Sequence, residues 1–286
     1  STRISIRIYS LRRCDMVSAS IVAYNTGYGE LRRCIDSLLC NGVSVIYVSD
    51  NSPDDSLRGF CDAIASVEYI HNDRNKGYGA GHNVAIRRAR QMGSDYHLVI
   101  NSDVYFGEGV IGRIASYMDA NPDVAQVIPN VVYPDGRLQY VVRLLPVPAD
   151  LIFRRFIPRK IAEKRNYRYC LEFFDHKRPV NVAYHQGSFM FFRMECFDKV
   201  GLFDERFFMY PEDIDITRRM HRYYRTMFFP DVTVVHAHRA ASYKSWRMLV
   251  VHMVNMVRYF NKWGWFFDKE RSEWNKRLLE ELGYEK

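Results

Sequence analysis

The chain has 286 residues, a net charge of +8, 48% hydrophobic residues and 15% aromatic residues. Its length is sufficient for one large domain or two modest ones with a substantial core. No run of residues approaches the ~20 consecutive apolar positions that a membrane-spanning helix needs, which excludes such a span. The basic charge suits nucleic acid, anionic membrane and phosphorylated small molecules equally, so charge alone selects none of these partners.

Cysteine usage and the first residues narrow the class of protein. The six cysteines are scattered, without a CxxC pair or a metal-ligand spacing, which is typical of reduced thiols in a cytoplasmic protein. Residues 1–16 contain four arginines but no apolar stretch of signal-peptide type. We interpret this segment as a basic leader without structured function, and Met16, directly before the first strand, as a candidate native start.

Strands and helices alternate in the first half of the chain. The expected strands are 17–23, 43–48, 67–71 and 96–100, and the expected helices are 30–39, about 54–65 and about 80–90. Because these strands are apolar almost throughout, they predict a parallel sheet covered on both faces. Polar residues follow each strand at the edge where such sheets bind ligands, which predicts a nucleotide site there.

The second half is less regular. A turn at 133–137 separates extended runs, and residues 151–178 are basic and aromatic without a clean period. We interpret 151–178 as a mobile or acceptor-facing insertion. The remaining expected elements are a strand at 182–193, helices at 194–200 and 211–224, a strand at 226–235, and a largely helical tail at 245–282.

Seven short motifs occur in an order that resembles glycosyltransferase family 2, and within it the rhamnosyltransferase-like branch. They are Ser20–Asn25, Val48–Ser52, Asn75–Asn83, Asn101–Val104, Gly187–Met190, Gly201–Asp215 and His236. The resemblance implies a GT-A fold, which is an α/β, Rossmann-like, mostly parallel central sheet with helices on both faces, here with a C-terminal helical extension. It implies a nucleotide-binding half at 17–104, an acceptor half at 105–242 and the extension at 243–286.

The resemblance also implies a reaction. An inverting enzyme of this kind moves a sugar from a nucleoside diphosphate onto an acceptor hydroxyl. The expected donor is deoxythymidine diphosphate (dTDP) rhamnose, and the expected acceptor is a cell-surface polysaccharide or its lipid-linked precursor. The expected location is the cytoplasm, at the inner face of the cell membrane.

Two loops are expected to bind the donor nucleotide. By resemblance, Ala23, Tyr24 and Asn25 line the base pocket and Asp50 hydrogen-bonds the pyrimidine ring, although Asp50 could instead cap the helix expected near residue 54. The glycine-rich loop at 75–83 lets backbone amides approach an anion at a helix N-terminus, or is a plain turn and cap. Its candidate contacts are Lys76, Gly77 and Asn83.

The motif Asn101-Ser102-Asp103 ends a strand where the family carries a DxD-type metal motif. Here asparagine replaces the first carboxylate, and Ser102 and Asp103 are the expected donor contacts. A divalent cation, Mg²⁺ or Mn²⁺, bridging the two phosphates would offset charge on the departing diphosphate. Asp103 and His236 are the expected metal ligands, and His238 could share the face of His236.

The pair Glu212-Asp213 lies at an expected helix start, where the helix dipole stabilises ionised carboxylates. Inverting transfer needs one such carboxylate to take the proton of the acceptor hydroxyl. By resemblance, Asp213 is the general base and Glu212 orients a sugar, whereas a solvated acidic helix start is the alternative. Gly187, Ser188 and Tyr210 are the expected acceptor contacts. Asp215 is expected to be structural, because Arg218 and Arg219 follow it.

Three other functions were weighed against sugar transfer. A sugar nucleotidyltransferase would carry basic residues in its first loop, and residues 23–27 have none. A non-catalytic carbohydrate-binding protein is conceivable from Asn101 but disfavoured by Asp103 and Asp213. No recognised motif supports nucleic-acid binding.

Basic residues and tryptophans alternate after residue 238, which suits either an interfacial helix on anionic membrane or simple packing on the domain.

Overall fold

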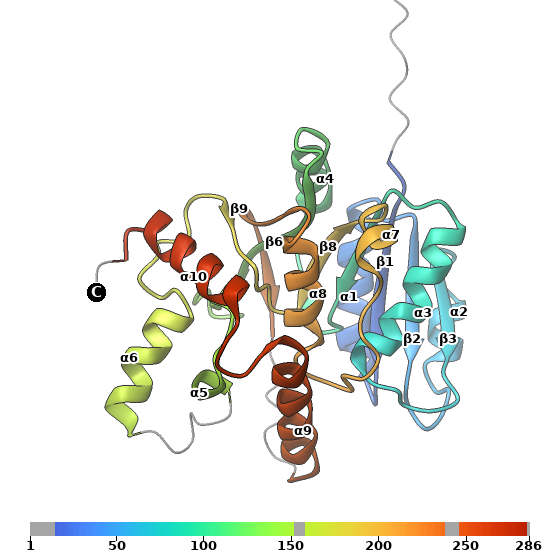
Figure 1. The fold of residues 1–286 in the computed structure, drawn as a ribbon. Helices are drawn as coiled ribbons and strands as arrows, with labels where there is room; N and C mark the ends of the chain where they lie inside the picture. Colours follow the sequence, from blue (N-terminus) through green and yellow to red (C-terminus); the bar gives the residue numbers. More distant parts are fainter. Residues whose placement is uncertain (1–14, 152–157, 238–245, 285–286) are drawn as a thin grey trace, which may run out of the picture.

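The computed structural model describes residues 15–151, 158–237 and 246–284, and within these a nine-stranded sheet runs through the molecule (Figure 1). The strand order is β3-β2-β1-β4-β8-β6-β9-β5, with β7 paired to β9. The strands are β1 Val17–Ala23, β2 Val45–Asp50, β3 Val67–His71, β4 Tyr96–Ile100, β5 Val104–Tyr105, β6 Val124–Val132, β7 Val180–Asn181, β8 Phe189–Arg193 and β9 Arg225–His236.

The sheet is parallel where the nucleotide half was predicted and mixed beyond it. Strands β3, β2, β1 and β4 pair in parallel, with Ala23 opposite Asp50 and Asp50 opposite His71. Strand β8 then runs antiparallel to β4 and to β6, and β6 is parallel to β9. The ends of β1, β2 and β3 therefore meet at one edge, as the sequence predicts, and β5 brings the residues after β4 against the end of β9.

Helices cover both faces of this sheet. They are α1 Tyr28–Cys40, α2 Arg58–Asp62, α3 Tyr78–Gln91, α4 Val110–Asp119, α5 Pro148–Leu151, α6 Arg159–Tyr169, α7 Cys196–Val200, α8 Glu212–His221, α9 Trp246–Trp263 and α10 Lys269–Glu281. The α/β expectation with a C-terminal helical extension is confirmed. None of the helices in the described ranges is both long and apolar enough to span a bilayer.

Alternation along the central strands divides the core into two layers. Leu98 and Phe191 pack with α1 on one face, whereas Val99 and Phe192 pack with α3, α7 and α8 on the other. Because successive side chains of a strand point to opposite faces, strands buried on both sides must be apolar throughout. This burial explains the continuous hydrophobic runs in the sequence.

Several expected boundaries were wrong. The second helix begins at Arg58 rather than near residue 54, so Asp50 does not cap it. The strand expected at 182–193 is shorter, since β8 covers only Phe189–Arg193, and β7 lies just before the expected range. The segment 151–178, which shows no clean period, contains α6. Basic residues occur on all sides of α6, so its sequence has no apolar stripe that would predict a helix.

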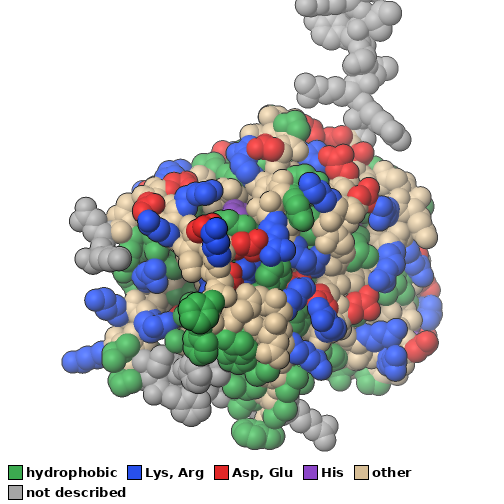
Figure 2. All heavy atoms as spheres, viewed as in Figure 1, with side chains coloured by type: hydrophobic (Ala, Val, Ile, Leu, Met, Phe, Trp, Pro, Cys, Tyr) green, Lys and Arg blue, Asp and Glu red, His purple; other side chains and the backbone are tan. Residues whose placement is uncertain are grey.

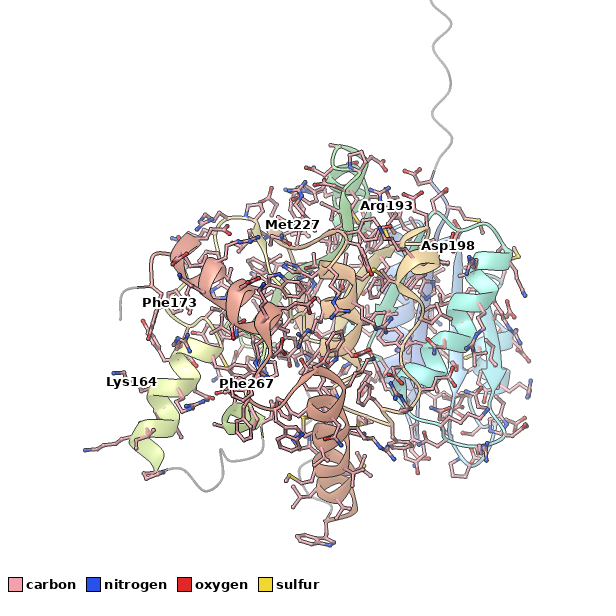
Figure 3. The ribbon with its side chains drawn as sticks, viewed as in Figure 1. Lys164, Phe173, Arg193, Asp198, Met227 and Phe267 are labelled. Atoms are coloured by element: carbon pink, nitrogen blue, oxygen red, sulfur yellow. The ribbon has the colours of Figure 1, made fainter. Side chains whose placement is uncertain are left out.

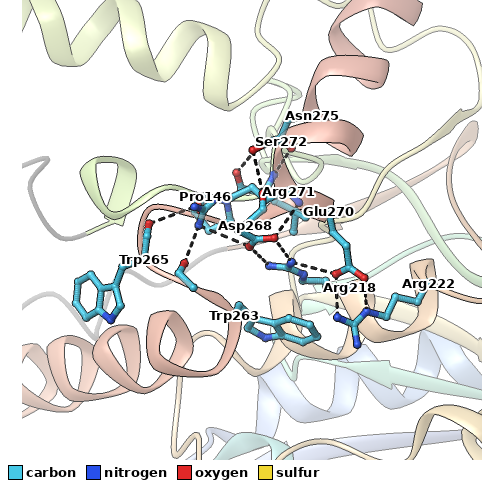
Figure 4. Close-up of polar contacts among 12 residues, drawn as sticks. Pro146, Arg218, Arg222, Trp263, Trp265, Asp268, Glu270, Arg271, Ser272 and Asn275 are labelled. Atoms are coloured by element: carbon cyan, nitrogen blue, oxygen red, sulfur yellow. Dashed lines mark hydrogen bonds and ion pairs between the residues drawn. The ribbon is translucent and has the colours of Figure 1, made fainter.

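The C-terminal helices are tied to α8 by a buried ionic cluster (Figure 4). The Arg218 side chain is 1% exposed, and its guanidinium donates two hydrogen bonds of 2.7 Å to the carboxylate of Asp268. It also lies 4.1 Å from the ring centre of Trp263 and donates to Glu270 at 3.1 Å. Asp268 caps α10 by accepting the amide of Arg271. One carboxylate thus links α8 to α10.

A second buried carboxylate on α8 links it to the end of α9. Asp215 is fully buried and accepts from Arg219 Nε at 2.9 Å and from Trp263 Nε1 at 2.9 Å. Lys262 Nζ lies 2.6 Å from the same carboxylate. Asp215 is therefore structural, as expected, and Arg219 is its partner. Arg218, the other expected partner, pairs with Asp268 instead.

We predict that Asp268→Asn destabilises the fold by about 3 kcal/mol, because it leaves the buried Arg218 charge without its carboxylate. Asparagine can still cap α10, so the loss reports the ion pair rather than the cap. Urea unfolding measures it. The matched control is Asp123→Asn in the exposed pair with Arg225, expected to cost less than about 1 kcal/mol. Equal losses in the two variants would contradict the buried-pair account.

Candidate active site

Asp213 lies in the first turn of α8 and is held from two sides. The amide of Gly187 donates to its Oδ2 at 3.0 Å, and the amide of Ile214 donates to its Oδ1 at 2.8 Å. A Cβ on residue 187 would lie 3.2 Å from the Asp213 Cβ, a tight contact that glycine avoids. The expected acceptor contact Gly187 and the expected base are therefore direct neighbours.

The environment of Asp213 favours a base that works near neutral pH. Burial raises the pKa of Asp213 to about 6, while the amides of Ile214 and Gly187 and the charge of Arg143 act to lower it. A carboxylate with this pKa is ionised at neutral pH and still basic enough to accept a proton from a hydroxyl group.

The carboxyl of Glu212 differs from that of its neighbour Asp213 in burial and in hydrogen bonding. It is 5% exposed, and its Oε2 atom has no hydrogen-bond partner. Burial, followed by the charge of Asp213, raises the pKa of Glu212 well above its ordinary value. The alternative of a solvated acidic helix start does not hold, because Glu212 and Asp215 are both buried. Two adjacent carboxyls with different protonation states are a common arrangement in catalytic sites.

Tyr78, at the start of α3, connects the Asp213 region to the end of β4. Its hydroxyl lies 2.7 Å from the carbonyl oxygen of Gly187 and 2.8 Å from Asn101 Oδ1. The pKa of Tyr78 is raised well above its ordinary value by burial and then by the charges of Glu212, Asp213 and Asp103. Charges from two separate parts of the sequence, the pair Glu212-Asp213 and Asp103, therefore act on one phenol.

Asp103 and His236 lie together, as the sequence predicts. Their closest atoms, Asp103 Oδ1 and His236 Nε2, are 3.3 Å apart. Gln139 donates from Nε2 to the His236 carbonyl at 2.7 Å, which orients its Oε1 to accept from His236 Nδ1 at 2.9 Å. The proton therefore lies on Nδ1, and Nε2 is the nitrogen that faces Asp103.

The remaining residues of the metal motif contact protein. The amide of Asn101 donates to the Ser188 carbonyl at 3.0 Å, and Ser102 Oγ donates to Glu30 at 2.5 Å. The Ser188 hydroxyl is buried without a partner. No group of three or more potential metal-ligating side chains occurs among the residues that the structure describes. His238 lies outside those residues.

The loops after β1 and β2 are joined at the predicted nucleotide edge. The amide of Asn51 donates to the Ala23 carbonyl at 2.9 Å, and that of Asn25 donates to Ser52 Oγ at 2.9 Å. Tyr24 between them is 54% exposed. Asp50 is fully buried, and its two oxygens accept from the Ser52 amide and the Tyr69 hydroxyl. In this structure Asp50 organises the edge, while Tyr24 offers an open ring.

The residues of the glycine-rich loop mainly contact other parts of the protein. A Cβ at Gly77 would lie 2.0 Å from the carbonyl oxygen of Phe208, and the amides of Gly77 and Tyr78 donate to Asn75 Oδ1 and to that carbonyl. Asn83 is also used internally, since its amide group bonds Phe203 and Glu205. These contacts show how the protein itself uses Gly77 and Asn83, and they favour the plain turn and cap of the two interpretations of this loop.

Lys76, in contrast, lines a cavity of about 320 Å³ beyond the ends of β2 and β3. Its other lining residues are Asn51, His71, Asn72, Asp73, Arg74, Ala80, Gly81 and Val84. The lining is polar and includes two cations, Arg74 and Lys76, which suits a nucleotide or another anionic ligand.

Sequence reasoning missed four residues of this region: Tyr78, Gln139, Arg143 and Glu30. Tyr78 lies inside the glycine-rich motif, between the candidate contacts Gly77 and Asn83, and no pattern there marks its hydroxyl. Gln139 and Arg143 lie in a stretch with no motif, and long-range pairing alone brings them to the site. The Arg143 guanidinium lies 5.7 Å from the ring centre of Tyr184 and influences Asp213. No local signal predicts these contacts.

We predict that Glu212→Gln changes how stability depends on pH. Because the folded-state pKa of Glu212 is raised, its contribution to stability is complete at low pH and is lost as pH rises through that pKa. The variant should match the wild type in mildly acidic buffer and become increasingly more stable in alkaline buffer. Thermal unfolding across pH measures this difference. A melting-temperature difference that stays constant with pH would contradict a raised pKa.

Comparisons with known proteins show which family this chain belongs to. The model of the family described as "Glycosyl transferase family 2" matches residues 18–201. The chain is 28% identical over 244 residues to an N-acetylglucosaminyl-diphospho-decaprenol L-rhamnosyltransferase of Mycobacterium tuberculosis, covering 80% of this chain and 78% of that protein. It is 26% identical over 185 residues to the rhamnosyltransferase WbbL of Escherichia coli, covering 61% and 65%.

Solved structures share the fold at lower identity. GalNAc-T7, solved with UDP, GalNAc and Mn²⁺, superposes with a TM-score of 0.60 at 16% identity, covering 78% of this chain and 43% of that one. The mannosyltransferase PcManGT from Pyrobaculum calidifontis, solved with GDP-Man and Mn²⁺, gives a TM-score of 0.56 at 16% identity, covering 86% and 65%. This chain thus spans less than two thirds of those chains. The family match covers more than half of the chain, which therefore belongs to glycosyltransferase family 2.

Proposed function

We propose that this glycosyltransferase is an inverting rhamnosyltransferase in which Asp213 is the general base. The observation that carries the proposal is the geometry of Asp213, whose two oxygens accept from the amides of Gly187 and Ile214 next to the buried Glu212, and burial raises its pKa to about 6. Inversion requires one displacement at the anomeric carbon, so one base suffices. Asp213 takes the proton of the acceptor hydroxyl as its oxygen bonds to that carbon and the diphosphate leaves.

Glu212 serves this reaction in its protonated form. A neutral carboxylic acid can donate a hydrogen bond to a sugar hydroxyl without adding a second negative charge next to Asp213. Its unpartnered buried Oε2 supports a ligand-binding role, because such an atom costs free energy unless a ligand completes its hydrogen bonds.

The donor is proposed to be dTDP-rhamnose, supported by the names of the mycobacterial and Escherichia coli relatives. Its nucleotide would bind at the edge formed by Ala23, Tyr24 and Asp50 and the cavity that contains Lys76. The exposed ring of Tyr24 can stack on a base, and Lys76 can attract phosphate.

Asp103 and His236 are proposed to hold a divalent cation, Mg²⁺ or Mn²⁺. One carboxylate and one imidazole fit a cation that takes its other ligands from water and the donor diphosphate. Gln139 supports this fit, because it places the His236 proton on Nδ1 and directs Nε2 to the Asp103 side. Bound there, the cation offsets the negative charge of the leaving diphosphate.

The acceptor is proposed to approach from the 105–242 half, past Gly187, Ser188 and Tyr210. The mycobacterial relative's name specifies a lipid-linked saccharide, which supports a lipid-linked or polysaccharide acceptor here. The donor would bind the 17–104 half. With its acceptor on a lipid, the enzyme would work at the inner face of the cell membrane.

A non-catalytic binding protein on the same fold is less well supported. Burying Glu212 beside Asp213 destabilises a fold, and a protein without catalysis would gain nothing from that cost. The unpartnered, buried Oε2 of Glu212 next to Asp213 favours chemistry.

We predict that Asp213→Asn lowers kcat by a factor of about 10² to 10⁴ while leaving donor affinity nearly unchanged, because the base acts only in the transition state. In the wild type, kcat/KM should fall about tenfold per pH unit below pH about 6, where Asp213 becomes protonated. Asp198→Asn on the exposed face of α7 is the matched control. Transfer that survives Asp213→Asn would rule out this base.

We predict that Mn²⁺ strengthens binding of dTDP-rhamnose and that Asp103→Asn removes this gain. Gln139→Leu should weaken Mn²⁺-dependent binding about tenfold, since outer-shell partners of a metal-bound histidine typically carry that effect. Titration calorimetry with and without Mn²⁺ measures both. Binding without metal should stay the same in all three proteins. A metal gain retained by Asp103→Asn would contradict the proposed ligand.

A further inference from the structure

The outer face of α9 carries an exposed apolar stripe. Trp246 is 76% exposed, and Val250, Val254 and Val257 are 45%, 44% and 40% exposed. Their spacing of four, four and three residues places them on one side of the helix. Large exposed apolar groups arranged in a line are unusual on a monomeric surface and mark a contact site.

The opposite face of α9 is firmly packed. Asn255, Met256, Tyr259 and Phe260 are all 2% exposed or less. The turn after α9 continues the exposed apolar surface with Phe266 and Phe267, which are 76% and 98% exposed. Figure 3 places Phe267 beside the upper end of α9, and Figure 2 shows hydrophobic side chains gathered over this lower part of the molecule. We call the four stripe residues and these two phenylalanines the apolar patch.

A basic cavity borders the apolar patch. It has a volume of about 430 Å³ and is lined by Arg206, Phe207, Arg258, Asn261 and Lys262. Arg258 is the residue after Val257 and donates to the carbonyl oxygen of Arg206 at 2.8 Å. Arg206 and Lys262 share the carboxylate of Asp204. Lys262 also reaches Asp215, whereas Arg258 donates to the uncharged oxygens of Arg206 and Asn255, so its charge is not neutralised by these contacts.

We propose that the apolar patch and the basic cavity together bind the surface of an anionic phospholipid bilayer. The valines, Trp246 and the two phenylalanines would enter the boundary between headgroups and acyl chains, and the cations would contact lipid phosphates. Charge complementarity favours this occupant over a second copy of the chain. In a symmetric pair each copy brings the same cations to the contact, whereas anionic lipid neutralises them.

The packed face of α9 connects this surface to the active site. Asn255 Nδ2 donates to the Met209 carbonyl at 2.9 Å, and the His252 ring contacts the Tyr210 ring edge-on with centres 5.4 Å apart. Met209 and Tyr210 directly precede the turn that carries Glu212 and Asp213. Docking would therefore set the catalytic carboxyls close to the bilayer, which suits a lipid-linked acceptor; this consequence, unlike the docking itself, rests on the proposed function.

Vesicle co-sedimentation of the full chain tests the docking without any sugar transfer. We expect binding to vesicles of phosphatidylcholine with phosphatidylglycerol, and little binding to phosphatidylcholine alone. Arg206→Gln with Arg258→Gln should lower the partition coefficient about twenty-five-fold, at about fivefold for each cation. Val250→Asp with Val254→Asp should reduce binding to background, because both positions enter the apolar boundary.

Matched controls carry the same charge changes elsewhere. Arg113→Gln with Lys276→Gln removes two exposed cations on α4 and α10, and Met92→Asp with Ile161→Asp adds two carboxylates at exposed apolar positions after α3 and on α6; both should bind as the wild type does. Variants on α9 that bind like these controls would overturn the proposal. So would a wild-type dimer in sedimentation velocity that Val250→Asp with Val254→Asp converts to monomer without any vesicle binding. Loss of transfer alone, with vesicle binding retained, would count against the proposed function and not against the docking.

Discussion

The arrangement of this enzyme depends on holding a buried, ionised carboxylate at the N-terminus of α8. Two backbone amides, of Gly187 and Ile214, stabilise the charge of Asp213, and the Gly187 amide is available only because β8 lies between β4 and β6. A Cβ at residue 187 would crowd the Asp213 side chain, at 3.2 Å from its Cβ. Desolvation raises the pKa of Asp213. The strand order of the sheet, the glycine at residue 187 and the dipole of α8 together limit that increase.

The C-terminal extension is part of this support. Asp215 and Arg218 on α8 are both buried, and their partners Lys262, Trp263 and Asp268 come from the end of α9 and the start of α10. The same α9 contacts the backbone just before Glu212. The extension therefore packs against α8 on one side and presents the apolar patch on the other, so it connects the candidate active site to that patch.

The sequence predicted the strands at 17–23, 67–71 and 96–100 and the approach of Asp103 to His236, because ordered motifs and apolar runs carry that information locally. It failed where long-range contacts decide. The glycines of the 75–83 loop fit either an anion contact or a plain turn in the sequence, and only the tertiary structure shows that Gly77 packs closely on Phe208. Likewise Gln139, which orients His236, lies 97 residues before it with no motif to mark it.

The stereochemistry of transfer tests the central claim most directly. A single base at Asp213 allows one displacement at the anomeric carbon, so the first product must have the opposite anomeric configuration from the donor. Proton NMR, following the anomeric signals of dTDP-rhamnose and product early in the reaction, distinguishes the two outcomes. We predict inversion. Retention would require a covalent intermediate or a different displacement, and would contradict the role assigned to Asp213.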